Sequence, residues 1–331
     1  MPSPGVGRIT LALLAVVPAA MGYPWQSTRS QWVLGVAVLV VIGLFGWRRG
    51  LYFTTMVRRR LAMGVRGGRP VPEPRADDRT TALLRIGPGP SDSEALPLPL
   101  IAGYLDRYGI RADTVRITNR NDASGGRQTW VGLTVCAVDN LAALRARSAR
   151  IPLAETAEAA ARRLADQLSE LGWDAAAAAP GDVPELLAVG PSDSARETWR
   201  AVRLGDSECL AAYRIAVDSG LSGALEGVWS VPVDETWTAL EIGWGDAGEP
   251  YTVAAACAFH GQSAPDAFDV AAPAPGLTPE YGNQRRALSA LDPLSSQRLG
   301  RHTDAPADLL ATLAWPTPVA GAHRAAEEAV T

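Results

Sequence analysis

Two apolar runs near the amino end constrain this chain more than any other feature. They cover residues 9–25 and 32–53, and only residues 26–31 separate them. Each run is close to the roughly 20 residues that an α-helix needs to cross a bilayer. The short connection allows only a tight turn. The sequence therefore predicts a transmembrane helical hairpin over residues 1–55, with both ends on one side of the membrane.

A cluster of arginines without any acidic residue begins near the end of the second run and sets the predicted orientation. It comprises Arg48, Arg49, Arg58, Arg59, Arg60, Arg66 and Arg69. Positive residues that flank a membrane span are retained in the cytoplasm, so we expect a protein of the inner membrane with both termini cytoplasmic. An alternative makes residues 1–20 a cleaved signal peptide. Cleavage there would leave almost no segment before the second run, so the hairpin is the better interpretation.

Small residues recur on one side of each predicted helix and are candidate helix-packing positions. They are Ala12, Ala15, Ala19 and Gly22 in the first helix, and Gly35, Gly43, Gly46 and Gly50 in the second. Such residues let membrane helices approach closely. Glycine is also frequent in membrane helices in general, and that alternative stays open. If both stripes are contact faces, one of them is available to a partner subunit.

The rest of the chain has the mixed composition of a soluble domain of the α+β class. Residues 56–80 form a basic juxtamembrane segment and linker, and residues 81–331 form a cytoplasmic domain, either as one unit or as two lobes that meet near residue 190. Alternating or continuous apolar runs predict strands at 81–86, 114–118, 129–138, 198–204, 211–217, 236–242 and 251–259. Helical periodicity predicts helices at 100–108, 152–171 and 307–314, whereas residues 262–306 look irregular.

Catalytic and metal-binding patterns are missing from the sequence. All 31 basic residues are arginine, so a P-loop and a Schiff-base lysine are both excluded. The three histidines are widely spaced, and Cys136, Cys209 and Cys257 never form a Cys-x-x-Cys pair. We expect these cysteines to be core residues in a reducing compartment. The sequence therefore predicts no catalytic residue, cofactor or metal, and the basic cluster is too local to indicate nucleic-acid binding.

Several segments together resemble one known family. They are FGWRRGLYFTT at 45–55, YLDRYGIRAD at 104–113, TWVGLTV at 129–135, HTDAPAD at 302–308 and WPTP at 315–318. This set is similar to the EccE family of mycobacterial type VII (ESX) secretion, and the likeness is greatest for the member of the third ESX system. It extends over nearly the whole chain. The motifs are not catalytic signatures, so no active-site residue carries over.

The resemblance implies a structural subunit of an inner-membrane secretion complex. Its partners would be the EccB, EccC and EccD components, with EccC as the ATPase, and its system would serve iron and zinc acquisition. Two other classes stay open. One is a membrane-tethered hydrolase or transferase that uses carboxylates such as Asp206, Asp304 or Asp308. The other is a lipid-surface module in which the arginine cluster binds anionic headgroups.

Overall fold

The chain divides into two units, Met1–Arg69 and Pro70–Thr331. The computed structural model describes part of each. In the first unit it describes residues 13–14, 16–17, 20–21, 28–45, 47–48, 51–52 and 59–60. In the second it describes residues 78–91, 95–147, 152–187, 195–205, 208–245, 251–261, 272–306 and 308–318. The domain boundaries drawn from the sequence stay predictions.

The first unit contains one long described helix, α2 (Thr28–Phe45), and a pair of two-residue strands. These strands, β1 (Trp47–Arg48) and β2 (Leu51–Tyr52), pair in the antiparallel sense. Among the described residues, no helix combines the length and the apolar character that crossing a membrane requires. The predicted two-helix hairpin is therefore not confirmed, and most of its first helix lies outside the described residues.

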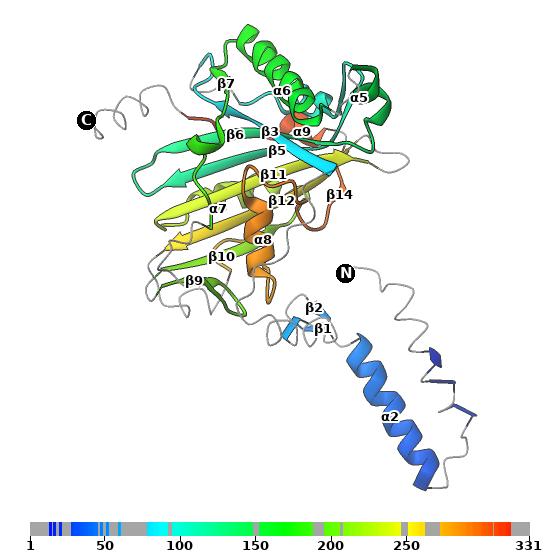
Figure 1. Ribbon diagram of the computed structural model, residues 1–331. Coiled ribbons are helices and arrows are strands. Elements are labelled where there is room, and N and C mark those ends of the chain that lie inside the picture. Colours follow the sequence, from blue (N-terminus) through cyan, green and yellow to red (C-terminus); the bar gives the residue numbers. More distant parts are fainter. Residues whose placement is uncertain are drawn as a thin grey trace. The chain divides into compact units, whose positions relative to one another are not determined.

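One large antiparallel sheet organises the second unit (Figure 1). Its main strands are β3 (Arg79–Ile86), β5 (Ile110–Asp122), β6 (Arg127–Cys136), β7 (Ala175–Ala177), β8 (Ala195–Glu197), β9 (Val202–Leu204), β10 (Glu208–Ile215), β11 (Glu235–Trp244) and β12 (Tyr251–Gly261). They lie in the order β7-β3-β6-β5-β11-β12-β10-β9-β8. Three short strands pair beside this path: β4 (Asp106–Arg107) with β5, β13 (Leu277–Pro279) with β10, and β14 (Thr303–Asp304) with β12.

The same strand pattern occurs twice in this sheet. β5, β6, β3 and β7 are neighbours in that order, and β11, β12, β10 and β13 repeat the order. In each set, a helix connects the first strand along the chain to the hairpin that follows it. These helices are α4 (Leu98–Ala102) after β3 and α7 (Leu221–Trp229) after β10. Because β5 pairs with β11, the two sets meet at the centre of the sheet.

Helices and loops cover both faces of the sheet, which explains why its central strands are buried along most of their length. On one face, α4, α6 (Leu153–Glu170), α7 and α9 (Leu309–Thr312) contribute to the larger core, with Leu164, Leu225 and Trp315 fully buried. On the other, α8 (Gln284–Leu291) contacts β10, β11 and β12 (Figure 1). On this face Trp130 also stacks on Trp237, with ring centroids 5.9 Å apart. Further helical elements are α5 (Leu141–Arg147), η2 (Gly103–Leu105) and η3 (Pro180–Asp182).

The prediction of mixed α and β structure is confirmed, and so are the predicted strands at 81–86, 129–138, 211–217, 236–242 and 251–259 and the helix at 152–171. Other predictions were wrong in part. The expected helix at 100–108 is helical only to Leu105, in the end of α4 and in η2, and is followed by β4 and the tight turn of Tyr108 and Gly109. Of the expected strand at 198–204 only the end forms, as β9, while β8 lies just before it. Residues 262–306, expected to be irregular, contain β13, α8 and β14.

Candidate functional site

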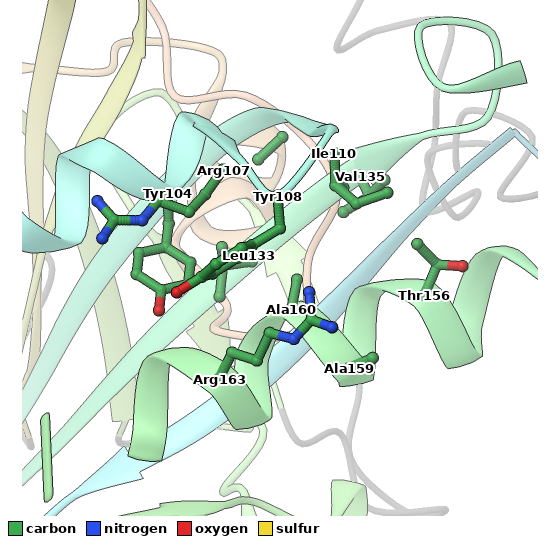
Figure 2. Close-up of a pocket in the computed structure, with 11 residues that line it drawn as sticks. Tyr104, Arg107, Tyr108, Ile110, Leu133, Val135, Thr156, Ala159, Ala160 and Arg163 are labelled. Carbon is green, nitrogen blue, oxygen red and sulfur yellow. The ribbon is translucent and has the colours of Figure 1, made fainter. Parts of the chain in front are cut away.

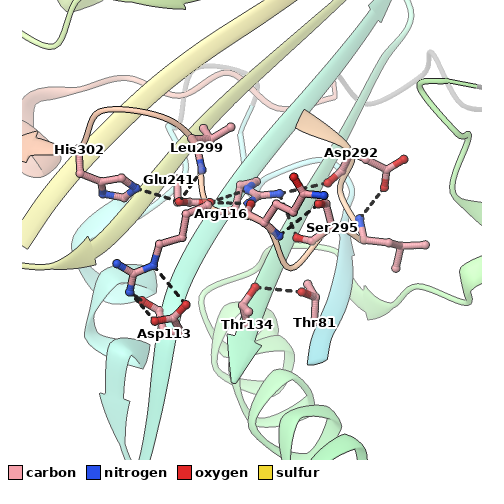
Figure 3. A network of polar contacts seen from close by, with 12 residues as sticks. Thr81, Asp113, Arg116, Thr134, Glu241, Asp292, Ser295, Leu299 and His302 are labelled. Carbon is pink, nitrogen blue, oxygen red and sulfur yellow. Dashed lines mark hydrogen bonds and ion pairs between the residues drawn. The ribbon is translucent and has the colours of Figure 1, made fainter. Parts of the chain in front are cut away.

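A buried ion pair lies at the centre of the sheet, where the two strand sets meet (Figure 3). Arg116 on β5 is the direct cross-strand partner of Glu241 on β11. Its Nε donates to Glu241 Oε2 over 2.8 Å. The two side chains are 4% and 0% exposed. A charged pair removed from water to this extent is stable only when its remaining donors and acceptors are also satisfied.

The guanidinium of Arg116 satisfies its other donors on the loop that follows α8. It donates to the carbonyl oxygens of Asp292 and Ser295 over 3.1 and 3.2 Å, and also to that of Gln297. These three residues are far from β5 in the sequence. The arginine therefore fixes the 292–297 loop to the middle of the sheet.

The carboxylate of Glu241 holds the next part of the same loop (Figure 3). Its Oε1 accepts from the backbone N–H of Leu299 over 3.0 Å and lies 2.8 Å from Nε2 of His302. Burial raises the pKa of Glu241, but the positive charge of Arg116 and the contact with His302 outweigh it and hold this pKa below its usual value. Glu241 is thus kept ionised as an acceptor for three groups.

A second buried acid, Asp113 on β5, also bonds to a residue of this loop. Asp113 accepts from Nε of Arg298 over 3.2 Å, and Arg298 also donates to the Asp113 carbonyl over 3.1 Å. Arg79 on β3 approaches the same carboxylate at 3.0 Å. Asp113 occupies an irregularity in the β5–β6 register, which directs its side chain toward the loop.

A hydroxyl, an imidazole and a carboxylate follow one another here, as they do in the catalytic triad of a nucleophilic enzyme. Thr252 Oγ1 lies 3.2 Å from His302 Nδ1, and His302 Nε2 lies 2.8 Å from Glu241. However, the Thr252 hydroxyl donates its single proton to the Trp244 carbonyl over 3.0 Å, so it has none to transfer to the imidazole. A Cβ on neighbouring Gly243 would lie 3.3 Å from His302, which shows how closely this place is packed. The arrangement is a structural clamp.

A separate pocket lies between α6 and the β4–β5 hairpin (Figure 2). Its volume is about 190 Å³. The lining is mainly apolar, with the side chains of Ile110, Ala112, Leu133, Val135, Ala159 and Ala160. Polar groups come from Tyr104, Arg107, Tyr108, Thr156 and Arg163. We call this site the tyrosine–arginine pocket.

The aromatic rings and guanidinium groups of this pocket contact one another. The rings of Tyr104 and Tyr108 meet edge to face at 6.3 Å. The guanidinium carbon of Arg107 lies 5.6 Å from the centroid of each ring, and that of Arg163 lies 4.8 Å from the Tyr108 ring. Tyr104 donates to Gln167 on α6 over 3.0 Å. Burial, followed by the neighbouring Tyr108, raises the pKa of Tyr104 to about 12, so its hydroxyl stays protonated.

The hairpin beside the pocket depends on an unusual turn. β4 and β5 pair Arg107 with Ile110, which leaves Tyr108 and Gly109 as a two-residue connection. Their φ angles are +56° and +73°. Two consecutive positive φ angles define the turn that matches the twist of a hairpin, and asparagine or glycine usually occupies both positions. A tyrosine at the first position is therefore strained, and the residue is 56% exposed.

The residues predicted for helix packing and membrane topology are only partly described. Gly35 and Gly43 lie in α2, and a Cβ at Gly35 would meet nothing within 4 Å. Arg48 lies in β1, and Arg59 and Arg60 are helical. The others lie outside the described residues: Ala12, Ala15, Ala19, Gly22, Gly46, Gly50, Arg49 and Arg58. The packing and topology roles of all of these residues stay predictions.

The groups considered for chemistry do not converge. Asp206 lies outside the described residues, and Asp304 on β14 and Asp308 before α9 are exposed. Within the described ranges there is no group of three or more histidine, cysteine or acidic side chains placed to hold a metal. The three cysteines are buried and unbridged, as expected, and burial raises the pKa of Cys257.

Sequence reasoning missed both of the arrangements described above. A signal for the ion pair is present, since Arg116 is the single charge of the predicted strand at 114–118 and Glu241 is that of the predicted strand at 236–242. Such charges indicate a buried pair, but the sequence does not show which charge pairs with which. The helix predicted at 100–108 extends over residues that form the β4–β5 hairpin, so neither this hairpin nor the pocket beside it was predicted.

Fold and sites together define a class of protein: a mixed α/β domain in which the buried charges bind loops and a small aromatic pocket opens at the surface. The comparisons with known proteins specify the class. The family model described as "Putative type VII ESX secretion system translocon, EccE" matches residues 123–215. The chain is also 59% identical over 323 residues to the ESX-3 secretion system protein EccE3 of Mycobacterium tuberculosis, which covers 97% of this chain and 95% of the relative.

A more distant relative agrees with this assignment. The ESX-3 secretion system protein EccE3 of Mycolicibacterium smegmatis is 46% identical over 293 residues, or 88% of this chain and 89% of the relative. The chain therefore belongs to the EccE family of type VII (ESX) secretion system components, and its similarity is to the ESX-3 members.

Proposed function

We propose that this chain is a non-catalytic structural subunit of a type VII secretion complex in the inner membrane. The observation that carries the proposal is the 59% identity to an ESX-3 secretion system protein over 97% of the chain. Because the similarity extends over nearly the whole chain, little of it remains for a domain with a role that the relative lacks. The ion network supports the same view, because its charged groups bond to one another and to loop backbone.

The proposed anchor is a membrane hairpin formed by residues 9–25 and 32–53, with both termini in the cytoplasm. The apolar runs and the arginine cluster that includes Arg48, Arg49 and Arg60 support it. In this arrangement the glycine and alanine stripes are available to pack against membrane helices of other subunits. Thiol labelling of intact cells at cysteines introduced into the domain tests the topology, since labelling from outside would refute it.

The proposed partners are the EccB, EccC and EccD components, with EccC as the ATPase, and the proposed task is to scaffold them during export linked to iron and zinc acquisition. The experiment is extraction in mild detergent with a tag on the carboxyl end, followed by identification of what co-purifies. Discrete membrane subunits that include an ATPase would support the scaffold. A lone monomer that turns over a small substrate would refute it and favour the membrane-tethered enzyme.

A further inference from the structure

The tyrosine–arginine pocket combines an apolar cavity, exposed aromatic surface and two positive charges. We propose that it binds a segment of a partner polypeptide in which a single apolar side chain is next to an aspartate or glutamate. The inference rests on the proposed function, because the partner is expected to be another subunit of the secretion complex. Three properties of the pocket carry it: its size, its charge and the conformation of Tyr108.

The size of the cavity favours a side chain over a cofactor or metabolite. Its volume is about 190 Å³. Sites for drug-sized ligands and cofactors usually measure about 300 to 1,000 Å³. Leu133 and Val135 from β6 line the pocket together with Ala160 from α6, which gives it apolar walls (Figure 2). One aliphatic or aromatic side chain is the group that matches this space.

The positive charge of the pocket favours an acidic residue of the partner, next to the partner's apolar side chain. Arg107 and Arg163 make cation–π contacts with the tyrosines, but neither guanidinium has an ion pair with any other described residue. Both lie close to the Tyr108 ring, at 5.6 and 4.8 Å from its centroid. A carboxylate that reaches this ring accepts charge-assisted hydrogen bonds from a guanidinium. Charge complementarity thus selects an acidic residue of the partner.

The conformation of Tyr108 indicates that its ring serves more than the turn. Its φ of +56° is one that asparagine or glycine adopts far more easily. The residue is nevertheless a tyrosine, and it is 56% exposed. Backbone strain of this kind collects at binding sites, and tyrosine and arginine are the residues that most often dominate binding energy at protein interfaces. A partner that covers the ring would explain why a tyrosine occupies this strained position.

Two neighbouring arginines on α6 provide a matched test. Arg163 lines the tyrosine–arginine pocket, whereas Arg162, next to it in the sequence and also exposed, lines a different hollow between α6 and β3. We expect Arg163→Glu in the full chain to reduce co-purification of at least one subunit roughly tenfold or more. Arg162→Glu carries the same change of charge and should leave co-purification at the wild-type level. Circular dichroism and thermal unfolding of both variants confirm that they are folded.

A photo-cross-linker at Tyr108 identifies the occupant in assembled complexes. A p-benzoylphenylalanine there is expected to attach to a peptide of another subunit that contains an acidic residue adjacent to an apolar one. Replacement of that acid by arginine should restore assembly of Arg163→Glu. This rescue separates direct pairing from an indirect effect of the variant.

The outcomes distinguish failure of the pocket from failure of the proposed function. If the wild-type chain co-purifies with its subunits and Arg163→Glu does so equally well, the pocket inference is refuted and the scaffold stands. Cross-links only to lipid or to a second copy of this chain would also overturn the inference. If the wild-type chain associates with no membrane subunit at all, the proposed function itself is refuted.

Discussion

Arg116 and Glu241 face each other across β5 and β11 and form an ion pair that solvent barely reaches. The pair lies on the two strands that join the repeated halves of the sheet, and its remaining hydrogen bonds hold the loop from Asp292 to Leu299. One buried interaction therefore connects three parts of the domain that are distant in sequence. Its removal is expected to affect the whole domain.

Loss of one member of this ion pair should destabilise the domain strongly. Arg116→Leu leaves the Glu241 carboxylate buried without its countercharge, and we expect the free energy of unfolding to fall by about 3–5 kcal/mol. Arg120→Leu is the control, because Arg120 pairs with Glu235 in a partly exposed place where the side chains are 27% and 16% accessible. Its loss should be about 1 kcal/mol. Denaturant unfolding of the full chain in detergent, followed by circular dichroism, measures both, and equal losses would contradict the account.

A double variant should recover part of this lost stability. Adding Glu241→Gln to Arg116→Leu removes the unpaired charge but keeps an amide oxygen that can accept from the Leu299 N–H. The double variant should therefore be more stable than Arg116→Leu alone, by about 1–2 kcal/mol. A double variant that is less stable than the single one would show that the lost stability does not come from an uncompensated charge.

The loss of stability at acid pH should come in part from protonation of Glu235. Burial raises the pKa of Glu235, but its contacts with His260 and Trp237 and the charge of Arg120 outweigh burial and lower this pKa to about 2. A carboxyl whose pKa is lower in the folded state contributes stability above its unfolded pKa, and loses it as the pH falls. We expect the stability to decline between pH 4.5 and about 2, and to decline less in Glu235→Gln. Thermal unfolding across this range measures the difference.

His260 should contribute stability that is lost as the pH rises, in contrast to Glu235. The carboxylate of Glu235, then that of Glu208, raises the pKa of His260 above 6.5 despite its burial. Its imidazole nitrogens lie 3.7 and 3.3 Å from these two carboxylates. A raised pKa contributes stability that is fully present below pH 6.5 and is lost as the pH rises through the folded-state value. Melting temperatures on either side of pH 6.5 should therefore decrease toward alkaline pH in the wild type, and a His260→Gln variant with the same decrease would contradict this assignment.

The elements predicted correctly are those whose local pattern and tertiary role agree. The helix at 152–171 has apolar residues at helical spacing, and the structure buries that stripe, including Ala161, Leu164 and Leu168, against the sheet. The strands at 129–138 and 251–259 are continuous apolar runs, as expected for strands covered on both faces. In these segments the sequence pattern directly reflects burial.

The elements that were missed depend on contacts that a local pattern does not contain. α8 begins in a stretch with many Pro, Gly and Ser, and its first residue, Gln284, is fully buried because its side chain bonds to the backbone of Ala212 on β10. That partner is distant in sequence. The segment at 104–108 has helical composition, but Gly109 and the strained Tyr108 close a hairpin instead. The tyrosine–arginine pocket depends on that hairpin, so it was not predictable.

The carboxyl-terminal segment should be essential for the stability of the domain. Trp315 is fully buried, contacts the Trp229 ring edge to face at 5.8 Å, and donates to Asn119 on β5 over 3.0 Å. Asn119 in turn donates to the Pro316 carbonyl over 2.8 Å. Trp315→Ala should reduce the free energy of unfolding by about 3–5 kcal/mol, because it leaves a cavity and an unpaired amide. Trp315→Phe, which keeps most of the ring volume, should cost less, and equal losses would show that packing is not the cause.

Two substitutions of Tyr108 distinguish the contribution of its backbone conformation from that of its ring. Tyr108→Asn and Tyr108→Ala both remove the aromatic side chain, but only asparagine adopts a φ of +56° with ease. We therefore expect the asparagine variant to be more stable than the alanine variant by about 1 kcal/mol. Both should bind the partner subunit equally weakly, since both lack the ring that Arg107 and Arg163 contact. Chemical unfolding measures the first effect and co-purification the second. If Tyr108→Asn retained full assembly, the ring would have no part in binding, and its strained conformation would need another explanation.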